Sequence, residues 1–201
     1  MKKANPKSIR AIIKNISDRE NLDFQLVVIA EEKKYSGVRL VIDSLFDTIR
    51  QTIQIDIGFG DVIMPAPVTI SFPVLLKELE SPVLLAYSTE TVIAEKFHAM
   101  ITLGNSNSRM KDLFDTYVLL KNNDINTENL TNAITATFKA RNTEYENEPV
   151  FFTESYYTNA SRNTMWNAFL RKNKLETLDF PTIVKSIITR LQPIYNELSN
   201  N

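Results

Sequence analysis

The chain contains no cysteine, which excludes disulfides, thiolate nucleophiles and cysteine-ligated metals and fits a reducing compartment. Only four glycines and eight prolines occur, which argues against flexible linkers and low-complexity segments. No apolar run approaches the roughly 20 residues that a membrane-spanning helix needs. The first ten residues are basic, but no apolar stretch follows them. We therefore expect no signal peptide, no membrane partner and a cytoplasmic location.

The chain also lacks an excess of either positive or negative charge. Lys and Arg number 23 against 24 Asp and Glu, so the formal net charge of the 201 residues is -1. No global positive field therefore indicates a nucleic-acid-binding protein. The length suits one sizeable domain, or one domain with a helical extension.

Periodic patterns divide the chain into a strand-rich first part and a helical second part. Residues 37–46 and 52–58 alternate apolar and polar side chains and predict neighbouring antiparallel strands. Residues 21–34 fit either a strand or a helix. The remaining patterned segments are a helix over 5–16, strands at 68–72 and 83–87, and later helices at 128–139, 162–171 and 181–198. The order predicts an α+β fold, a small β-sheet followed by a C-terminal helical bundle.

Residues 89–120 predict two amphipathic helices joined by a short polar turn. The expected buried positions are Val92, Ile93, Phe97, Met100 and Ile101 in the first helix, and Met110, Leu113, Phe114, Tyr117 and Val118 in the second. Lys96 borders the first apolar stripe, and Asp112 lies in the first turn of the second helix. Helices joined by a turn of a few residues pack antiparallel. We therefore expect Lys96 and Asp112 to lie close together in one cleft, with Asp56 on a facing sheet edge.

Several segments match a known family in order along the chain. The stronger matches are IQIDIGFGD (53–61), ETVIAEKFHAM (90–100) and NSRMKDLFD (107–115), and the weaker ones are ATFKARNT (136–143) and WNAFLRK (166–172). With these segments the chain resembles the AbiEii/AbiGii group of nucleotidyltransferase-like toxins, the enzymatic half of abortive-infection toxin–antitoxin pairs. The pairing of AEK-x-HA with SR-x-KD-x-x-D carries most of the resemblance.

The resemblance implies a layout, a reaction and partners. The layout is a helical leader at 1–34, a nucleotidyltransferase-like sheet at 35–87 and a helical half at 88–201. The reaction is transfer of a nucleotide from an NTP, with Mg²⁺, to an acceptor such as tRNA. The implied partner is a cognate antitoxin that neutralises the toxin.

Two features of active relatives are missing from the chain. Such enzymes hold the nucleotide with a Gly-Gly or Gly-Ser turn and bind two metal ions through Asp-x-Asp, and this sequence contains neither pattern. Asp23 has no partner carboxylate two residues away, and we interpret Gly58-Phe59-Gly60 as a turn rather than a phosphate loop. We therefore predict an internally shortened, impaired family member. The alternative is a non-catalytic binding module for an antitoxin, a partner subunit or RNA.

The resemblance also implies roles for residues of the two central helices. Lys96, Asp112 and Asp115 would be catalytic residues, Asp115 as the partner that positions Lys96 or Arg109. Arg109 and Lys111 would contact the nucleotide. Residue chemistry alone leaves simpler accounts open. Lys96 could extend its ammonium into water from an apolar stem. Asp112 and Asp115 could be acids favoured by the helix dipole, paired with surface cations.

Asp56 lies in a strictly alternating stretch, on the face opposite Ile55 and Ile57. It is either a solvent-facing acid or, by the resemblance, a metal ligand. One carboxylate alone would bind Mg²⁺ poorly, because it offers little against the hydration of that ion.

His98 is the single histidine of the chain, and we interpret it as a structural residue rather than a base. No second ligand of the usual kind supports a zinc site. The densest basic cluster comprises Arg162, Arg171, Lys172 and Lys174, near the expected core residues Trp166 and Phe169. It is either a solvated helix face or a surface that faces RNA.

Overall fold

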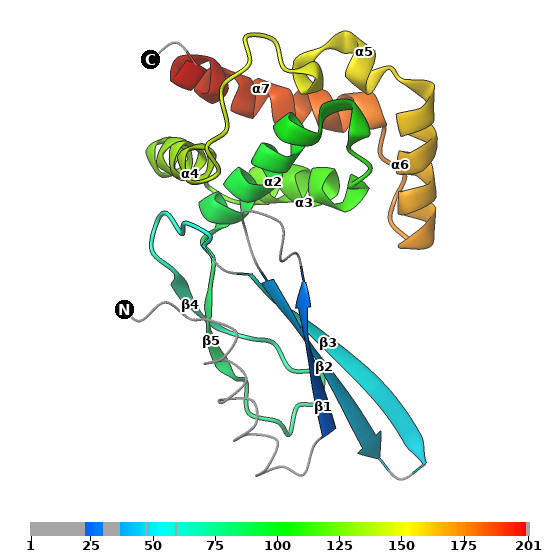
Figure 1. Ribbon diagram of the computed structural model, residues 1–201. Coiled ribbons are helices and arrows are strands. Elements are labelled where there is room, and N and C mark those ends of the chain that lie inside the picture. The colour runs from blue at the N-terminus through cyan, green and yellow to red at the C-terminus, as the bar shows by residue number, and fades with distance from the viewer. Residues whose placement is uncertain (1–22, 30–36, 47, 59, 200–201) are drawn as a thin grey trace. The chain divides into compact units, whose positions relative to one another are not determined.

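The computed structural model describes residues 23–29, 37–46, 48–58 and 60–199. The chain forms two compact units, residues 1–61 and 62–201. The first unit contains an antiparallel sheet in the order β1–β2–β3, made of Asp23–Ile29, Gly37–Phe46 and Ile49–Gly58. Its three strands are drawn in blue to cyan in Figure 1.

The sheet of the first unit confirms the predicted antiparallel strands. Strand β2 pairs with β3 along its whole length, and this register sets Arg39 opposite Asp56. The segment 21–34, which fitted either a strand or a helix, contains strand β1. All seven residues of β1 pair with residues of β2. Val38 and Leu40 of β2 are buried on one face, as the alternation requires.

The second unit begins with a small antiparallel hairpin. Its strands are β4 (Val68–Ser71) and β5 (Val83–Ala86), and they form a two-stranded sheet of their own. Large apolar side chains remain exposed here, including Leu75 between the strands and Leu85 on β5, at 102% and 76% of full exposure. This hairpin therefore adds little to the packed core.

Helices make up the rest of the second unit. Their bounds are α2 Thr89–Leu103, α3 Met110–Asn122, α4 Thr127–Ala140, α5 Glu154–Tyr157, α6 Ala160–Lys172 and α7 Phe180–Ser199, with 3₁₀ turns η1 at Gly104–Ser106 and η2 at Val150–Phe152. The predicted helices are confirmed to within two residues. Side chains of Ser88, Asn126 and Asn159 cap α2, α4 and α6 by accepting N–H hydrogen bonds. Turn η2 and helix α5 were not predicted.

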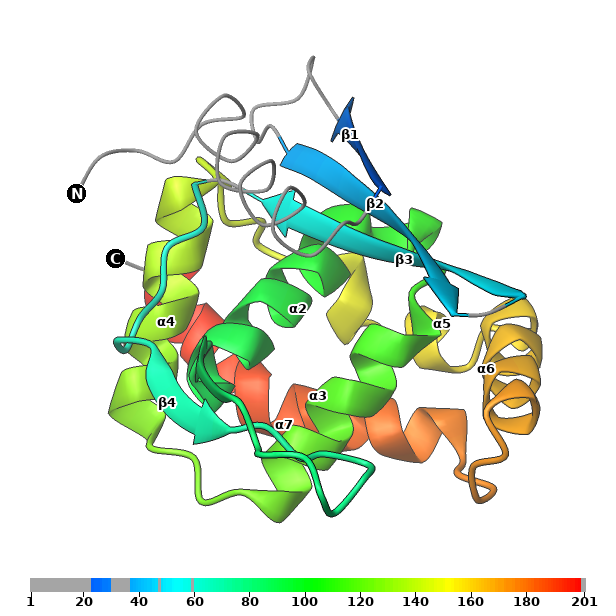
Figure 2. The same cartoon turned by 90° about the horizontal axis from the view of Figure 1, so that it is seen from below.

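Aromatic residues dominate the core between these helices. Phe97 of α2 has no exposed surface, and its ring lies 6.1 to 6.4 Å from those of Phe138, Phe151, Phe152 and Tyr195. In Figure 2, α2 and α3 run side by side with α7 behind them. Aromatic contacts of this kind stabilise a core beyond the area they bury. Helix α2 is therefore held firmly along its inner face.

Four expectations about the core need correction, because Val92 of α2 and Phe114, Tyr117 and Val118 of α3 are each only partly buried. Phe114 of α3 packs against Trp166 and Phe169 of α6 and is covered by them only in part. Val92 of α2 is also partly exposed and lines a cavity instead of the core. Trp166 is fully buried, as predicted.

The α+β class is confirmed, whereas the nucleotidyltransferase-like order of the sheet and the three domain ranges stay predictions. The helix expected at 5–16 lies outside the described residues. Among the helices that the structure describes, none has the length and apolarity needed to cross a membrane.

Candidate functional site

Lys96 lies between two aspartates of the neighbouring helix. Its Nζ is 2.7 Å from Oδ1 of Asp112 and 2.8 Å from Oδ2 of Asp115. The side chains of Lys96, Asp112 and Asp115 are 18%, 14% and 24% exposed. The expected approach of Lys96 to Asp112 is therefore confirmed, and Asp115 contacts Lys96 as the resemblance implied. Their catalytic role stays a prediction.

The turn between α2 and α3 sets this geometry. Gly104 ends α2 with φ of 45°, a left-handed conformation that favours glycine, and its N–H bonds to the carbonyl of Met100. Arg162 of α6 donates hydrogen bonds to the carbonyls of Gly104, Asn105 and Asn107, at 3.3, 3.0 and 3.1 Å. Its guanidinium also lies 4.0 Å from the ring centre of Tyr156. The turn that separates Lys96 from Asp112 is thus held by a distant residue.

Further ion pairs surround the three central groups. Arg109 Nε lies 3.2 Å from Asp112 Oδ2, and Lys111 Nζ lies 2.6 Å from Asp115 Oδ2. Glu95, next to Lys96 on α2, pairs with Arg141. Among the residues that the structure describes, four cations of this cluster thus meet three carboxylates, an excess of one positive charge. Such a cluster attracts an anion while its geometry remains fixed.

A polar cavity of about 420 Å³ opens onto this network. It is lined by Tyr87, Val92, Glu95, Lys96, Arg109, Asp112 and Arg141. Lys96 has three donor hydrogens, of which two are used on the aspartates, so the third can be donated to a ligand in the cavity. Lys111 and Asp115 are not among the lining residues. They support the cavity through Lys96.

Four lining residues were missed by the sequence analysis. Glu95 and Arg141 lie inside matched segments, AEKFHA and ATFKARNT, so the matches themselves carried a signal for this pair. Tyr87 and Val92 carried no such signal, because one follows a strand and the other occupies an apolar position of a helix.

Electrostatics favour the charged forms of the central groups. Burial lowers the pKa of Lys96, but its hydrogen bonds to Asp112 and Asp115 outweigh burial and leave that pKa raised. Burial likewise raises the pKa of Asp115, and the bonds from Lys111 and Lys96 overcome it, so the net pKa is lowered. Both residues therefore carry their charges at neutral pH.

His98 is a structural residue in this arrangement, as its isolation in the sequence suggested. It is buried, its Nε2 lies 2.7 Å from Thr143 Oγ1, and its ring meets that of Phe138 at 5.0 Å. Burial, and then the charge of Arg141, lower its pKa to about 4, so the imidazole is neutral at pH 7. It does not line the polar cavity.

Asp56 lies on β3 in the first unit, where it binds Arg39 of β2. Two hydrogen bonds of 2.6 and 2.8 Å join the guanidinium to the carboxylate. The bond from Arg39 is also the main cause of the lowered pKa of Asp56. A metal ion at Asp56 would have to displace this guanidinium, and the metal-binding role stays a prediction.

The carboxylates that the structure describes do not fit a resident magnesium ion. They form no group of three or more side chains placed to hold a metal. Asp112 and Asp115 already bind lysine and arginine side chains, so their oxygens are not free for the several ligand positions that Mg²⁺ requires. Lys96, Arg109 and Arg141 are the cations that line this cavity.

The basic cluster of Arg162, Arg171, Lys172 and Lys174 does not form one exposed face. Arg162 is 4% exposed and binds backbone carbonyls, so both expectations for it, a solvated face and an RNA-facing surface, were wrong. Arg171 and Lys174 are exposed. Lys172 lines a second groove, beside α3.

Comparison with known proteins gives a match to a family model. The family model described as nucleotidyl transferase AbiEii toxin, type IV TA system, matches residues 1–186 of the 201. Searches of the curated proteins and of the solved structures each found no match.

Proposed function

This chain belongs to the AbiEii family of nucleotidyl transferase toxins of type IV toxin–antitoxin systems, and from that premise we propose that its Lys96 cavity binds the phosphates of an NTP. We further propose that transfer of the nucleotide to an acceptor, for which tRNA is our choice, is impaired in this chain. The family also suggests an antitoxin as partner.

One observation carries the phosphate assignment. Lys96 is held by two aspartates at 2.7 and 2.8 Å in a cavity that it shares with Arg109 and Arg141. A lysine fixed in this way offers a preorganised point charge to a triphosphate. Asp112 and Asp115 then act as positioning residues, which keep the ammonium in place and charged.

Impairment follows from what phosphoryl transfer requires. The acceptor hydroxyl must form a bond to the α-phosphorus while the bond to the bridging oxygen breaks, so that pyrophosphate leaves and a proton passes to water. Catalysis of this step comes mainly from positioning and from neutralising charge on the phosphates. The cavity supplies part of the charge. The Gly-Gly or Gly-Ser turn and the Asp-x-Asp pair are absent from the sequence.

The test uses the full chain, labelled NTPs supplied as magnesium complexes, and total tRNA. We expect weak NTP binding that Lys96→Ala removes, and labelling of tRNA no higher than background. Lys77→Ala serves as the matched control, because Lys77 is an exposed lysine outside the cavity. Strong labelling abolished by Lys96→Ala would contradict the impairment, and NTP binding unaffected by Lys96→Ala would contradict the site.

A second candidate function is a binding module without catalysis. The exposed apolar side chains of the β4–β5 segment, among them Leu75, Val83 and Leu85, favour it, since such patches often mark protein interfaces. In that case the chain would bind the cognate antitoxin, and the double variant Leu75→Ser, Leu85→Ser would weaken the complex. An unchanged affinity in this variant would remove the second candidate.

A further inference from the structure

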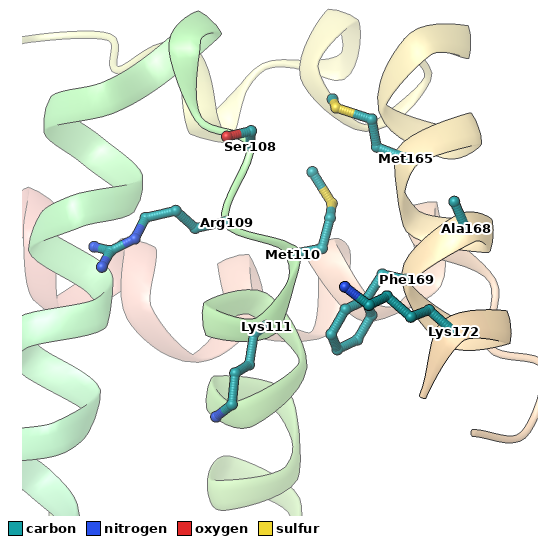
Figure 3. Close-up of a pocket in the computed structure, with 8 residues that line it drawn as sticks. All are labelled: Ser108, Arg109, Met110, Lys111, Met165, Ala168, Phe169 and Lys172. Carbon is teal, nitrogen blue, oxygen red and sulfur yellow. The ribbon is translucent and has the colours of Figure 1, made fainter. Parts of the chain in front are cut away.

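An apolar groove lies beside the polar cavity, between the start of α3 and the last two turns of α6. Its volume is about 440 Å³, within the usual range for ligand sites. Met110, Met165, Ala168 and Phe169 supply its apolar lining, and Figure 3 shows them facing one another across the two helices. We call it the α3–α6 groove.

Phe169 gives this groove a rigid aromatic surface. Its ring is half-buried and is supported by Trp166 and Phe114, whose ring centres lie at 5.6 and 5.9 Å. Trp166 is itself fixed by a 2.7 Å hydrogen bond from Nε1 to the carbonyl of Leu178. A supported ring is a platform on which a planar base can stack, and flexible methionines beside it can fit the edge of that base.

The charged side chains of the groove are all cationic. No carboxylate lines it. Arg109 and Lys111 point away from Phe169 and bind Asp112 and Asp115, whereas Lys172 points into the groove (Figure 3). Lys172 makes no ion pair within the part of the chain that the structure describes. Helix α3 also begins here, and the positive end of its dipole favours an anion, although the N–H groups of Met110 and Asp112 already donate to the carbonyls of Ser108 and Arg109.

We propose that the α3–α6 groove binds one nucleotide unit of a single-stranded RNA, with the base on Phe169 and the phosphate against Lys172. The flat supported ring and the single unpaired cation fit an aromatic base joined to one phosphate better than an acidic peptide, whose anchors are not planar. Arg109 lines both this groove and the Lys96 cavity, so a nucleotide bound here lies next to the NTP site. The groove is then the place of the acceptor strand, an assignment that rests on the proposed function.

The chain contains a built-in reporter for this test. Trp166 is its only tryptophan and packs directly against Phe169, so binding in the groove should change its fluorescence. The full chain is titrated, without NTP or metal, with a fluorescein-labelled five-nucleotide adenosine RNA, with AMP and with a short poly-L-glutamate. Anisotropy of the labelled RNA gives its affinity, and unlabelled RNA is used for the tryptophan signal. We expect the RNA to bind, AMP to bind more weakly, and poly-L-glutamate to leave the tryptophan signal unchanged.

Four variants locate the binding. Phe169→Leu keeps an apolar side chain but removes the stacking surface, and should weaken RNA binding about tenfold. Lys172→Gln should weaken it several-fold and lower the slope of log affinity against log salt by about 0.7, as expected for one lost phosphate contact. Arg171→Gln, the same charge change on the same helix outside the groove, should leave binding within about twofold. Ala168→Glu adds a carboxylate at an exposed helical position, and should abolish binding without lowering the melting temperature.

The outcomes separate this proposal from the proposed function. Equal losses in Lys172→Gln and Arg171→Gln, no RNA binding, or RNA binding that persists in Ala168→Glu would overturn the groove assignment. Poly-L-glutamate that binds as tightly as RNA would also overturn it, in favour of an acidic-peptide site. RNA binding with the expected variant pattern but no NTP binding at Lys96 would leave the groove standing and refute only the NTP site.

Discussion

The β2–β3 sheet and the α2–α3 helix pair each contain an ion pair between an aspartate and a cation at a similar distance. The surroundings of the two ion pairs differ. In the sheet, Arg39 and Asp56 meet at 2.6 Å with side chains 39% and 54% exposed. Between α2 and α3, Lys96 meets Asp112 at 2.7 Å with side chains 18% and 14% exposed. The first pair is open to water and counter-ions, which weaken it, whereas the second is partly shielded from them. A short ion pair therefore does not by itself mark a site.

The support behind each pair explains the difference. Arg39 and Asp56 are direct neighbours across two strands, so the register alone brings them together. Lys96 and Asp112 depend on packed helices, since Phe97 next to Lys96 is fully buried among other aromatic rings. The helical cluster should therefore respond to changes in the core, while the strand pair should not.

The largest expected effect is at Phe97. Phe97→Ala removes a ring from the packed centre and should destabilise the second unit by about 3–5 kcal/mol, because a cavity remains. Urea unfolding followed by tryptophan fluorescence measures the loss. Leu85→Ala, at a 76% exposed position, should change the free energy of unfolding by no more than about 0.5 kcal/mol. Similar losses in the two variants would show that the helical core does not hold α2.

The next effect is at Lys96. A lysine exposed at a surface could be replaced at little cost, but Lys96→Met leaves Asp112 and Asp115 facing each other without their shared ammonium. Removing one partner of a fully buried pair costs about 3–5 kcal/mol, so this half-buried cluster should lose about 1–3 kcal/mol. Adding Asp115→Asn should restore part of the loss, which chemical unfolding of the double-mutant cycle would measure. No recovery in the double variant would show that the carboxylates do not repel each other here.

A smaller effect concerns pH. The folded-state pKa of His98 is about 4 against an ordinary value of 6.5, so the unfolded chain binds more protons between these values. The contribution of neutral His98 is complete above pH 6.5 and falls as the pH drops towards 4. After allowance for solvent screening we expect a loss of about 1–2 kcal/mol over this range. Unfolding free energies measured at several pH values should show this loss, and His98→Gln should flatten it. An identical slope in the variant would contradict the assignment.

The smallest effect is at the strand pair. Arg39→Gln and Asp56→Asn should each leave the thermal melting curve unchanged within error, because both side chains are open to solvent. Repeating the melts in 1 M salt should reduce any residual difference, as screening shortens the reach of exposed charges. A clear loss of stability in either variant would mean that exposure alone does not separate the two regions.

Local patterns in the sequence predicted most elements and the central contact. Strand Gly37–Phe46 was predicted from alternation, and Lys96 was placed near Asp112 from two helices joined by a short turn. The pairing of Glu95 with Arg141 was not predicted, because 46 residues separate them and no periodicity links α2 to the end of α4.

Arg162 shows most clearly what could not be predicted from the sequence. Its charge suggested a surface, yet its partners are carbonyl groups 55 to 58 residues earlier in the chain. Backbone carbonyls occur at every position, so the sequence carries no mark of those that accept from an arginine. The burial of Phe114 was overestimated for a related reason. Its helical spacing fits a core position, but its ring is only partly buried where it packs against Trp166 and Phe169.

The contacts of Arg162 also determine when, during synthesis, the polar cavity can first reach its final geometry. The ribosome synthesises α2, the following turn and α3 before α6. The carbonyls of Gly104, Asn105 and Asn107 therefore lack their donor, Arg162, until α6 has been made. Domains generally fold as units once their chain is available. The turn that sets the distance between Lys96 and Asp112 is therefore fixed only late in synthesis. A ribosome-bound chain that stops before residue 162 would contain every lining residue of the polar cavity. It would lack Arg162, whose hydrogen bonds hold the turn between α2 and α3.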